Sequence, residues 1–317
     1  MAAVLFRYFL RCVIALLALA VVGWGLYVAI RFHHVENRAY RWAAGLNAGL
    51  AQWNPSEQRQ SGLGLPGYRM ELRGLAVEGV EQDLSGLAYD ASADRLLAVT
   101  KNPRRILALD RNGGVLGEYP LENLSDPEGI AWLGGSRVAV VDERHGRIVV
   151  LTLPPAPGPI DADLAPSLQL NLGDQRNDGL EGLGYDRRHD RLYAVKEHSP
   201  PRLYRITGLG RATRPGGAGR LSLQVEDLSP WLAPAAFATD LASVEFDPAS
   251  GHILLLSEES NMILEIDAED GSPLSLRALG SAPGDATVVQ PEGLAIDERG
   301  TIYVVSEPNL FYRLRKP

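Results

Sequence analysis

Short apolar runs separated by polar turns recur along most of the chain after residue 68. Five of these runs share one pattern, with Gly or Ser at the fourth position: DLSGLAYD (83–90), DPEGIAWL (126–133), GLEGLGYD (179–186), DLASVEFD (240–247) and QPEGLAID (290–297). Their fourth residues are 43, 53, 61 and 50 positions apart. Self-similarity at this period is typical of the blades of a β-propeller.

Each copy is followed by further runs rich in β-branched, aliphatic or aromatic residues, which favour strands. The second run of each unit reads RLLAVTK, RVAVVDE, RLYAVKE, HILLLSE and TIYVVSE in chain order, and a third run follows in every unit. A fourth run is present in four units, as VLGEYPL, SLQLNL, LSLQVED and PLSLRAL. Four antiparallel strands make one propeller blade.

The last unit has no fourth run before the chain ends at Pro317, whereas the strand-like YRMELRGLAV (68–77) precedes the first unit without a partner. We therefore predict that residues 68–77 supply the outer strand of the last blade. The predicted fold is all-β, a five-bladed β-propeller. A six-bladed ring is the alternative, because the third unit contains the insertions GLGRATRPGGAGR and SPWLAPAAFAT. Their Gly, Pro and Ala content favours loops.

An N-terminal apolar segment stands apart from the repeats. Val13–Ile30 is an uninterrupted apolar run of 18 residues with Arg7 and Arg11 before it and Arg31 after it. At about 1.5 Å per residue, such a helix just spans a hydrocarbon core of about 30 Å. We predict an uncleaved transmembrane anchor in residues 1–31, a stalk in residues 32–66 and the propeller in residues 67–317. A cleaved signal peptide is the alternative, although the run is long for one.

Glutamates recur at two positions of the repeat. In a blade, the first strand lines the channel and the second runs antiparallel to it, so the start of the first and the end of the second share one mouth. These positions carry Glu128 with Glu143, Glu181 with Glu197, Glu258 in the fourth unit, and Glu292 with Glu307. The first unit has Ser85 and Lys101 instead. Glu245, which replaces the Ala or Gly of the other copies, is expected to project into the channel.

So many carboxylates around one axis require a bound cation, basic neighbours or raised pKa values. An all-oxygen ligand set suits Ca²⁺, whereas zinc is less suitable because no pair of histidines has ligand spacing. Two other interpretations stay open. The glutamates could accept backbone N–H groups and hold neighbouring blades together, or they could act as catalytic acids and bases. His198, which follows Glu197, is the candidate general base, with a solvated loop histidine as the alternative.

Composition narrows the function classes. With 31 Lys and Arg against 39 Asp and Glu, the net charge of −8 disfavours nucleic-acid binding. Cys12 is the only cysteine, so no disulfide forms within the chain. The sequence has no P-loop, GxSxG or HExxH motif. The expected partners are the membrane and a small ligand or envelope protein, and Trp231 in an inserted loop is a candidate to cap the channel or contact a partner.

The segments LSGLAYD, VVDER, GLEGLGY, LSEES and PEGLAID…IYVVSEPNLFYR resemble the SdiA-regulated family over about residues 68–315. The resemblance implies a bacterial protein with an inner-membrane anchor, a periplasmic propeller and calcium association. It implies no established reaction. The PEGLA element is also similar to that of lactonase, strictosidine-synthase-like and NHL propellers, whose channels hold metal-binding carboxylates at positions comparable to Glu128, Glu181 and Glu292. Their Asn and Asp partners are not recognisable here.

Three functions therefore remain. The first is a binding or scaffolding module with a cation at an acidic channel mouth. The second is a metal-dependent hydrolase of a lactone, ester or phosphoester that uses the same carboxylates. The third is a structural propeller that interacts through Trp231 and its loop.

Overall fold

The computed structural model describes residues 11, 17–25, 62–170, 179–197, 200–214, 222–235, 238, 240–280 and 284–317. The chain forms two compact units, residues 1–48 and residues 49–317. In the first unit, residues 17–25 are helical. Among the described residues, no helix has the length and hydropathy of a membrane span. Half of the predicted span Val13–Ile30, and the stalk up to residue 61, lie outside the described residues.

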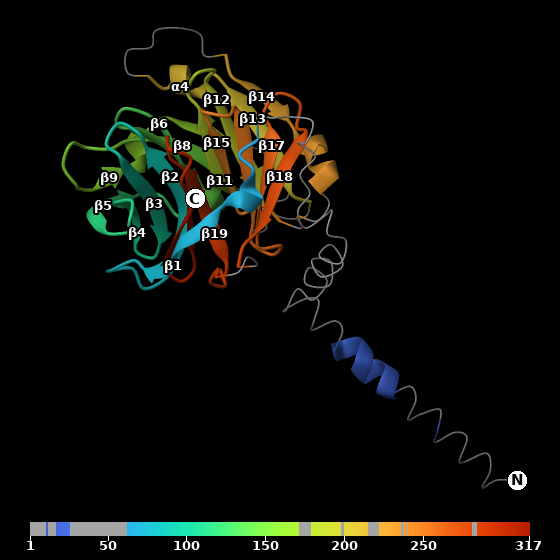
Figure 1. Cartoon of the computed structure of the whole chain (residues 1–317). Coiled ribbons are helices and arrows are strands. Elements are labelled where there is room, and N and C mark those ends of the chain that lie inside the picture. The colour runs from blue at the N-terminus through green and yellow to red at the C-terminus, as the bar shows by residue number, and fades with distance from the viewer. Residues whose placement is uncertain are drawn as a thin grey trace, which may run out of the picture. The chain divides into compact units, whose positions relative to one another are not determined.

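The second unit contains five sheets whose inner strands contact one another in a closed cycle (Figure 1). From the inner to the outer strand, the blades are β2 (Leu84–Asp90), β3 (Arg95–Lys101), β4 (Arg104–Leu109) and β5 (Val115–Glu122); β6 (Pro127–Gly134), β7 (Arg137–Asp142), β8 (Arg147–Thr152) and β10 (Ser167–Gln169); β11 (Leu180–Asp186), β12 (Arg191–Lys196), β13 (Arg202–Thr207) and β14 (Gln224–Asp227); β15 (Ser243–Asp247), β16 (His252–Ser257), β17 (Met262–Asp267) and β18 (Pro273–Ala278); and β19 (Pro291–Ile296), β20 (Ile302–Ser306), β21 (Leu310–Arg315) and β1 (Arg69–Ala76). This confirms the five-bladed propeller.

The first strand of the propeller closes the ring, as the sequence predicts. β1 runs antiparallel to β21, with Arg69 opposite Arg315 and Ala76 opposite Leu310. In Figure 1 the cyan β1 accordingly lies beside the red C-terminal strand. The last blade therefore combines strands from both ends of the propeller. Without β1, this blade would expose the unpaired edge of β21.

The segment before β1 is also part of the propeller. The N–H of Leu63 donates to Glu265 Oε1 at 2.7 Å, and that of Leu65 donates to Ser275 Oγ at 3.2 Å. Glu265 and Leu65 are both fully buried. Leu65 begins the short 3₁₀ turn η2 (Leu65–Gly67). Residues that the sequence analysis assigned to the end of the stalk thus pack on the fourth blade.

The apolar core consists of five clusters, one between each pair of neighbouring blades. Every blade therefore packs both faces of its sheet against a neighbouring blade. Strands buried on both faces read as continuous apolar runs rather than as alternating apolar and polar positions. This explains runs such as β16, in which every residue is buried.

The insertions add small elements and no sixth blade in the described residues. β9 (Ile160–Asp161) pairs in parallel with β5 and extends the first blade. In the third unit, the predicted loops contain α4 (Leu209–Ala212) and η5 (Ser229–Ala235). Trp231 in η5 packs against the core between the third and fourth blades and covers Gly271. A residue that caps the channel would project freely from the surface, and Trp231 does not.

The inner strands approach one another most closely at the fourth position of the repeat. A Cβ atom on Gly86 would lie 2.4 Å from the carbonyl oxygen of Glu128, and one on Gly129 would lie 2.2 Å from that of Glu181. Only glycine allows backbones to pack this closely. Along each inner strand that has one, the glutamate at the third position comes before the point of closest approach. Glu245 comes after that point on its own strand.

Candidate functional site

Backbone hydrogen bonds bring the two glutamate positions of a blade to the same mouth of the channel. The N–H of Glu143 donates to the carbonyl of Asp126 at 3.0 Å, and the N–H of Glu307 donates to that of Gln290 at 3.1 Å. β19 and β20 are antiparallel, with Pro291 opposite Ser306. Glu292 and Glu307 therefore share one end of the last blade, as predicted. We call this end the acidic mouth; it holds the seven glutamates predicted from the repeat.

Glu128 is the most buried of these glutamates, with 1% of its surface exposed. Two residues of the preceding blade contact its carboxylate. Lys101 Nζ lies 2.6 Å from Oε1, and Ser85 Oγ donates to Oε2 at 2.9 Å. The two residues that break the glutamate pattern in the first unit thus pair directly with a glutamate of the second.

Charges in the acidic mouth are strongly coupled. Burial raises the pKa of Glu128 to about 7, against the opposing attraction of Lys101. Burial also raises the pKa of Glu181 well above its usual range, and the repulsion of Glu128 adds to this shift. The pKa of Glu292 is likewise raised well above the usual range by burial, although Lys101 acts in the opposite direction. Burial opposes the charge of Lys101, but the attraction of Glu128 still raises its pKa.

These interactions show that the acidic mouth brings together glutamates from four blades. Glu181 is affected by Glu128, Glu143 and Glu197, and Glu292 is affected by Glu128, Glu258 and Glu307. All seven predicted glutamates therefore belong to one electrostatic network around Lys101. Such a network is short of positive charge, which favours either protonation or a bound cation.

Three carboxylates of the second blade have the spacing of a metal site. Asp126, Glu128 and Glu143 each offer an oxygen atom, and these atoms lie within 4.8 Å of one another. Asp126 was not among the predicted site residues, although it stands two residues before Glu128 in DPEG. Asp126 forms an ion pair with Arg144, at 3.6 Å. Oxygen ligands of this kind suit Ca²⁺ or Mg²⁺.

The same glutamates also connect blades. Glu143 accepts a hydrogen bond from the backbone N–H of Gly179, at the start of the third blade, at 3.2 Å. Lys101 and Glu128 link the first blade to the second. The architectural role that the sequence left open is therefore present for these two glutamates. Both carboxylate oxygens of Glu128 are engaged, by Lys101 and Ser85, and one oxygen of Glu143 is engaged by Gly179.

The candidate Glu245 lies away from the acidic mouth. Glu245 lines a cavity with Trp132, Arg187 and Glu298, at the end of the inner strands opposite the acidic mouth. The one charged neighbour that shifts its pKa is Asp247 on its own strand. Its position separates Glu245 from the seven glutamates. His198, the candidate general base, lies outside the described residues.

Comparisons with solved structures find other proteins with a similar arrangement of strands. A luciferin-regenerating enzyme is 13% identical, covers 78% of this chain and 95% of its own, and has a TM-score of 0.48. A glutaminyl cyclase of Myxococcus xanthus is 14% identical, with 78% and 95% coverage and a TM-score of 0.47. A streptogramin B lyase is 12% identical, with 79% and 98% coverage and a TM-score of 0.44. None of these likenesses assigns an activity to this chain.

The family model described as SdiA-regulated matches residues 60–315. The match begins just before Leu63 and Leu65, which attach to the fourth blade, and it ends at the last residue of β21. It therefore covers the whole ring, including the closing strand and the acidic mouth. The chain belongs to the SdiA-regulated family.

Proposed function

We propose that this protein is a binding or scaffolding module that holds a divalent cation, Ca²⁺, at the acidic mouth. The observation that carries the proposal is the cluster of Asp126, Glu128 and Glu143, with oxygen atoms within 4.8 Å of one another. A bound Ca²⁺ would offset the charge of the surrounding glutamates. With ligand positions open to solvent, it would also offer a docking point for an anionic group of a small ligand or an envelope protein.

Lys101 is the natural competitor of the cation, because its ammonium group contacts Glu128. A metal ligand must be deprotonated, and burial raises the pKa of Glu128 to about 7. Calcium binding near neutral pH is therefore expected to displace Lys101 and to release protons. Affinity should rise as the pH increases through 7.

The test is calorimetric titration of the purified full-length chain with CaCl₂, together with thermal unfolding in calcium and in chelator. Saturable binding and a higher unfolding temperature that chelator reverses are expected. Glu143→Gln removes a charged ligand and should weaken binding at least about tenfold. Glu78→Gln is the matched control, because Glu78 is exposed and loses the same charge. Absence of calcium binding at millimolar concentration would refute the proposal.

The second candidate is a metal-dependent hydrolase, favoured by one observation. Because the pKa of Glu128 is about 7, its carboxyl group is suited to transfer protons near neutral pH. Turnover of a lactone, ester or phosphoester that is lost in chelator and in Glu128→Gln would support the enzyme. Calcium binding without turnover of any of these supports the binding module.

The anchor and the periplasmic location are proposed from the sequence of residues 1–31. The 18-residue apolar run and the arginines before it support an orientation with the N-terminus in the cytoplasm and the propeller on the periplasmic side of the inner membrane. Retention in membranes after alkaline extraction, with protease access in spheroplasts, is the expected result. Release by alkali would indicate a cleaved or peripheral N-terminus.

A further inference from the structure

A second opening of the channel lies opposite the acidic mouth. It contains a cavity of about 60 Å³ lined by residues of all five blades. We call it the aromatic mouth and define it by Tyr89, Trp132, Arg187, Glu245, Phe246 and Glu298. Neither the repeat pattern nor the acidic cluster accounts for these residues.

Aromatic rings form the walls of this mouth. Trp132 and Phe246 are nearly buried, with 8% and 7% of their surface exposed, and Tyr89 is half-buried. The guanidinium carbon of Arg187 lies 4.3 Å from the ring centroid of Trp132. A cation stacked on an indole at this distance is held by the quadrupole of the ring. Arg187 is therefore positioned at the cavity although its side chain is exposed.

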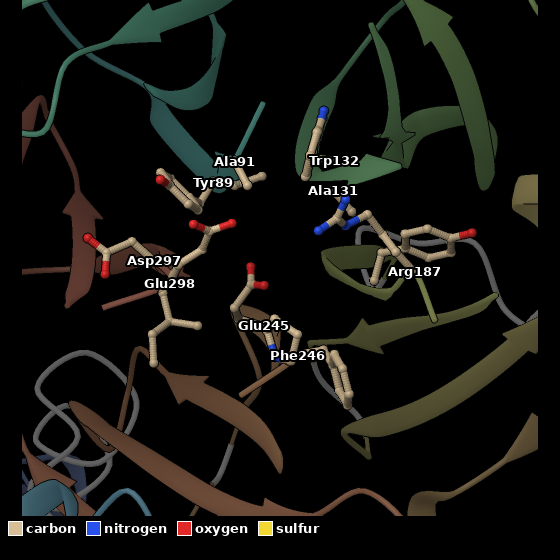
Figure 2. A pocket seen from close by; sticks show the side chains of 13 residues that line it. Tyr89, Ala91, Ala131, Trp132, Arg187, Glu245, Phe246, Asp297 and Glu298 are labelled. Atoms are coloured by element: carbon tan, nitrogen blue, oxygen red, sulfur yellow. The ribbon is translucent and has the colours of Figure 1, made fainter. Parts of the chain in front are cut away.

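Three groups that can carry charge point into the cavity. Figure 2 shows the guanidinium of Arg187 and the carboxyl groups of Glu245 and Glu298 directed toward the same space. In the described part of the chain, no ion pair joins any of these three to another charged residue. The neighbouring Asp297 is different, because it pairs with Arg111 and accepts a hydrogen bond from Tyr303 at 2.9 Å.

Glu245 occupies the innermost of these positions, on the inner strand β15. The other four blades have Ala or Gly at the equivalent position, so at this position of the repeat only the fourth blade carries a carboxyl group. Burial raises the pKa of Glu245 well above its usual range. A buried carboxyl group without a cationic partner is costly when ionised, and a bound cation would remove that cost.

We propose that the aromatic mouth binds a small zwitterion, an α-amino acid, whose carboxylate pairs with Arg187 and whose ammonium group pairs with Glu245 and Glu298. A simple amine would be repelled by Arg187, and a simple carboxylate would be repelled by Glu298. Only a ligand with both charges satisfies both signs at once. Arg187 also has the planar geometry that suits a carboxylate.

The size of the cavity agrees with this ligand. One water molecule needs about 10–15 Å³ of such space, so about 60 Å³ holds roughly four to six non-hydrogen atoms. The ammonium nitrogen, the α-carbon and the carboxylate of an amino acid are five atoms. The side chain would extend toward solvent past Tyr89 and Phe246.

The test compares three probes on the purified full-length chain in chelator by calorimetric titration or ligand-observed NMR. The probes are L-alanine, ethylammonium and propionate, which have similar size and differ in charge. L-alanine should bind saturably, and each singly charged probe should bind at least about tenfold more weakly, as expected for the loss of a charged hydrogen bond. Equal affinity for L-alanine and ethylammonium would overturn the zwitterion assignment.

Variants locate the site. Arg187→Gln should weaken L-alanine binding about tenfold or more, whereas Arg188→Gln, which removes an exposed charge from the next residue of the same turn, should leave it within twofold. Glu298→Gln should weaken binding of L-alanine, with Glu78→Gln as its control. Arg187 and Glu298 are exposed, so these changes remove no buried packing. Unchanged binding in Arg187→Gln, or no binding of L-alanine even at tens of millimolar, would refute the proposal.

Discussion

At the scale of single residues, the first blade differs from the others because it contributes no glutamate to the acidic mouth. Four blades contribute glutamates, and the first contributes Ser85 and Lys101, which both contact Glu128. Lys101 acts as a covalently tethered counter-ion. Burial first, and repulsion between neighbouring carboxylates second, raise the pKa values of Glu181 and Glu292 despite the opposing attraction of Lys101, and burial likewise raises that of Glu128.

The stability of the metal-free protein should therefore depend on Glu128. Its pKa of about 7 in the folded protein exceeds the ordinary value of 4.5, so the folded state binds this proton more tightly than the unfolded state. The free energy of unfolding should fall as the pH rises from about 4.5 to about 7, and a shift of this size corresponds to roughly 3 kcal/mol. Urea unfolding of Glu128→Gln in chelator should show a smaller fall over this interval. An equal fall in Glu128→Gln and in Glu78→Gln would contradict the assignment.

The sequence predicted the glutamates of the acidic mouth but not their chemistry. Their positions follow from the repeat, because the third residue of each copy lies at the same end of its blade. Asp126 was missed because the first position of the repeat varies among Asp, Gly and Gln. The partners of Glu128 come from the preceding blade, and contacts between blades depend on the twist and packing of the ring. Glu245 was expected in the channel, but only the structure places it with Trp132 and Arg187.

At the scale of strands, the pattern of each repeat reflects contact between the inner strands. β6 has an irregular register between Pro127 and Ile130, the stretch that contains Glu128 and Gly129. Similar irregularities occur at the same place in β2, β11 and β19. A bulge reorients a side chain and leaves a residue unpaired. The Glu–Gly pair therefore combines a carboxylate at the channel mouth with a very close approach of neighbouring backbones.

Gly129→Ala should be strongly destabilising because the added methyl group would lie 2.2 Å from the carbonyl oxygen of Glu181. Backbone at this point cannot move without shifting a neighbouring blade, so we expect a loss of about 3 kcal/mol in the free energy of unfolding. Gly158→Ala is the control, because the nearest atom to its Cβ is 3.9 Å away. The measurement is denaturant unfolding of both variants. Similar stability for the two would mean that the inner strands tolerate side chains at the glycine positions.

The strands themselves were predictable, with limits that have a physical origin. The predicted closing strand, residues 68–77, corresponds to β1 (Arg69–Ala76). Strands buried on both faces give long apolar runs that stand out in a sequence. β9 has only two residues and pairs in parallel with β5, so it leaves no periodic pattern. The packing of Trp231 on the core was not predictable, because an aromatic residue in an insertion can pack on the core as readily as it can face a partner.

At the scale of the whole molecule, two connections hold the ring closed. β1 completes the last blade, and Leu63 and Leu65 attach to Glu265 and Ser275 of the fourth blade. The buried Glu265 also contacts His252 at 2.7 Å, so its carboxylate is well supplied with hydrogen bonds. The residues just before β1 thus bridge the fourth and fifth blades.

A pair of truncations tests this closure. A protein of residues 62–317 keeps every described contact of the ring and should fold with an unfolding temperature close to that of the full chain. A protein of residues 78–317 lacks β1 and the fully or nearly buried Leu65, Tyr68 and Met70. At about 1.5–3 kcal/mol for each buried side chain, the loss is roughly 5 kcal/mol or more, which is comparable to the whole stability of many domains.

The expected outcome for residues 78–317 is an unfolded or self-associating protein, because β21 would become an exposed edge strand. Circular dichroism and size-exclusion chromatography separate these outcomes from a folded monomer. A synthetic peptide of residues 62–77 added in trans should restore the folded monomer, since the closing strand contributes through pairing with β21 and burial rather than through its covalent connection to β2. A folded, monomeric 78–317 with unchanged unfolding temperature would show that four blades and a three-stranded fifth suffice.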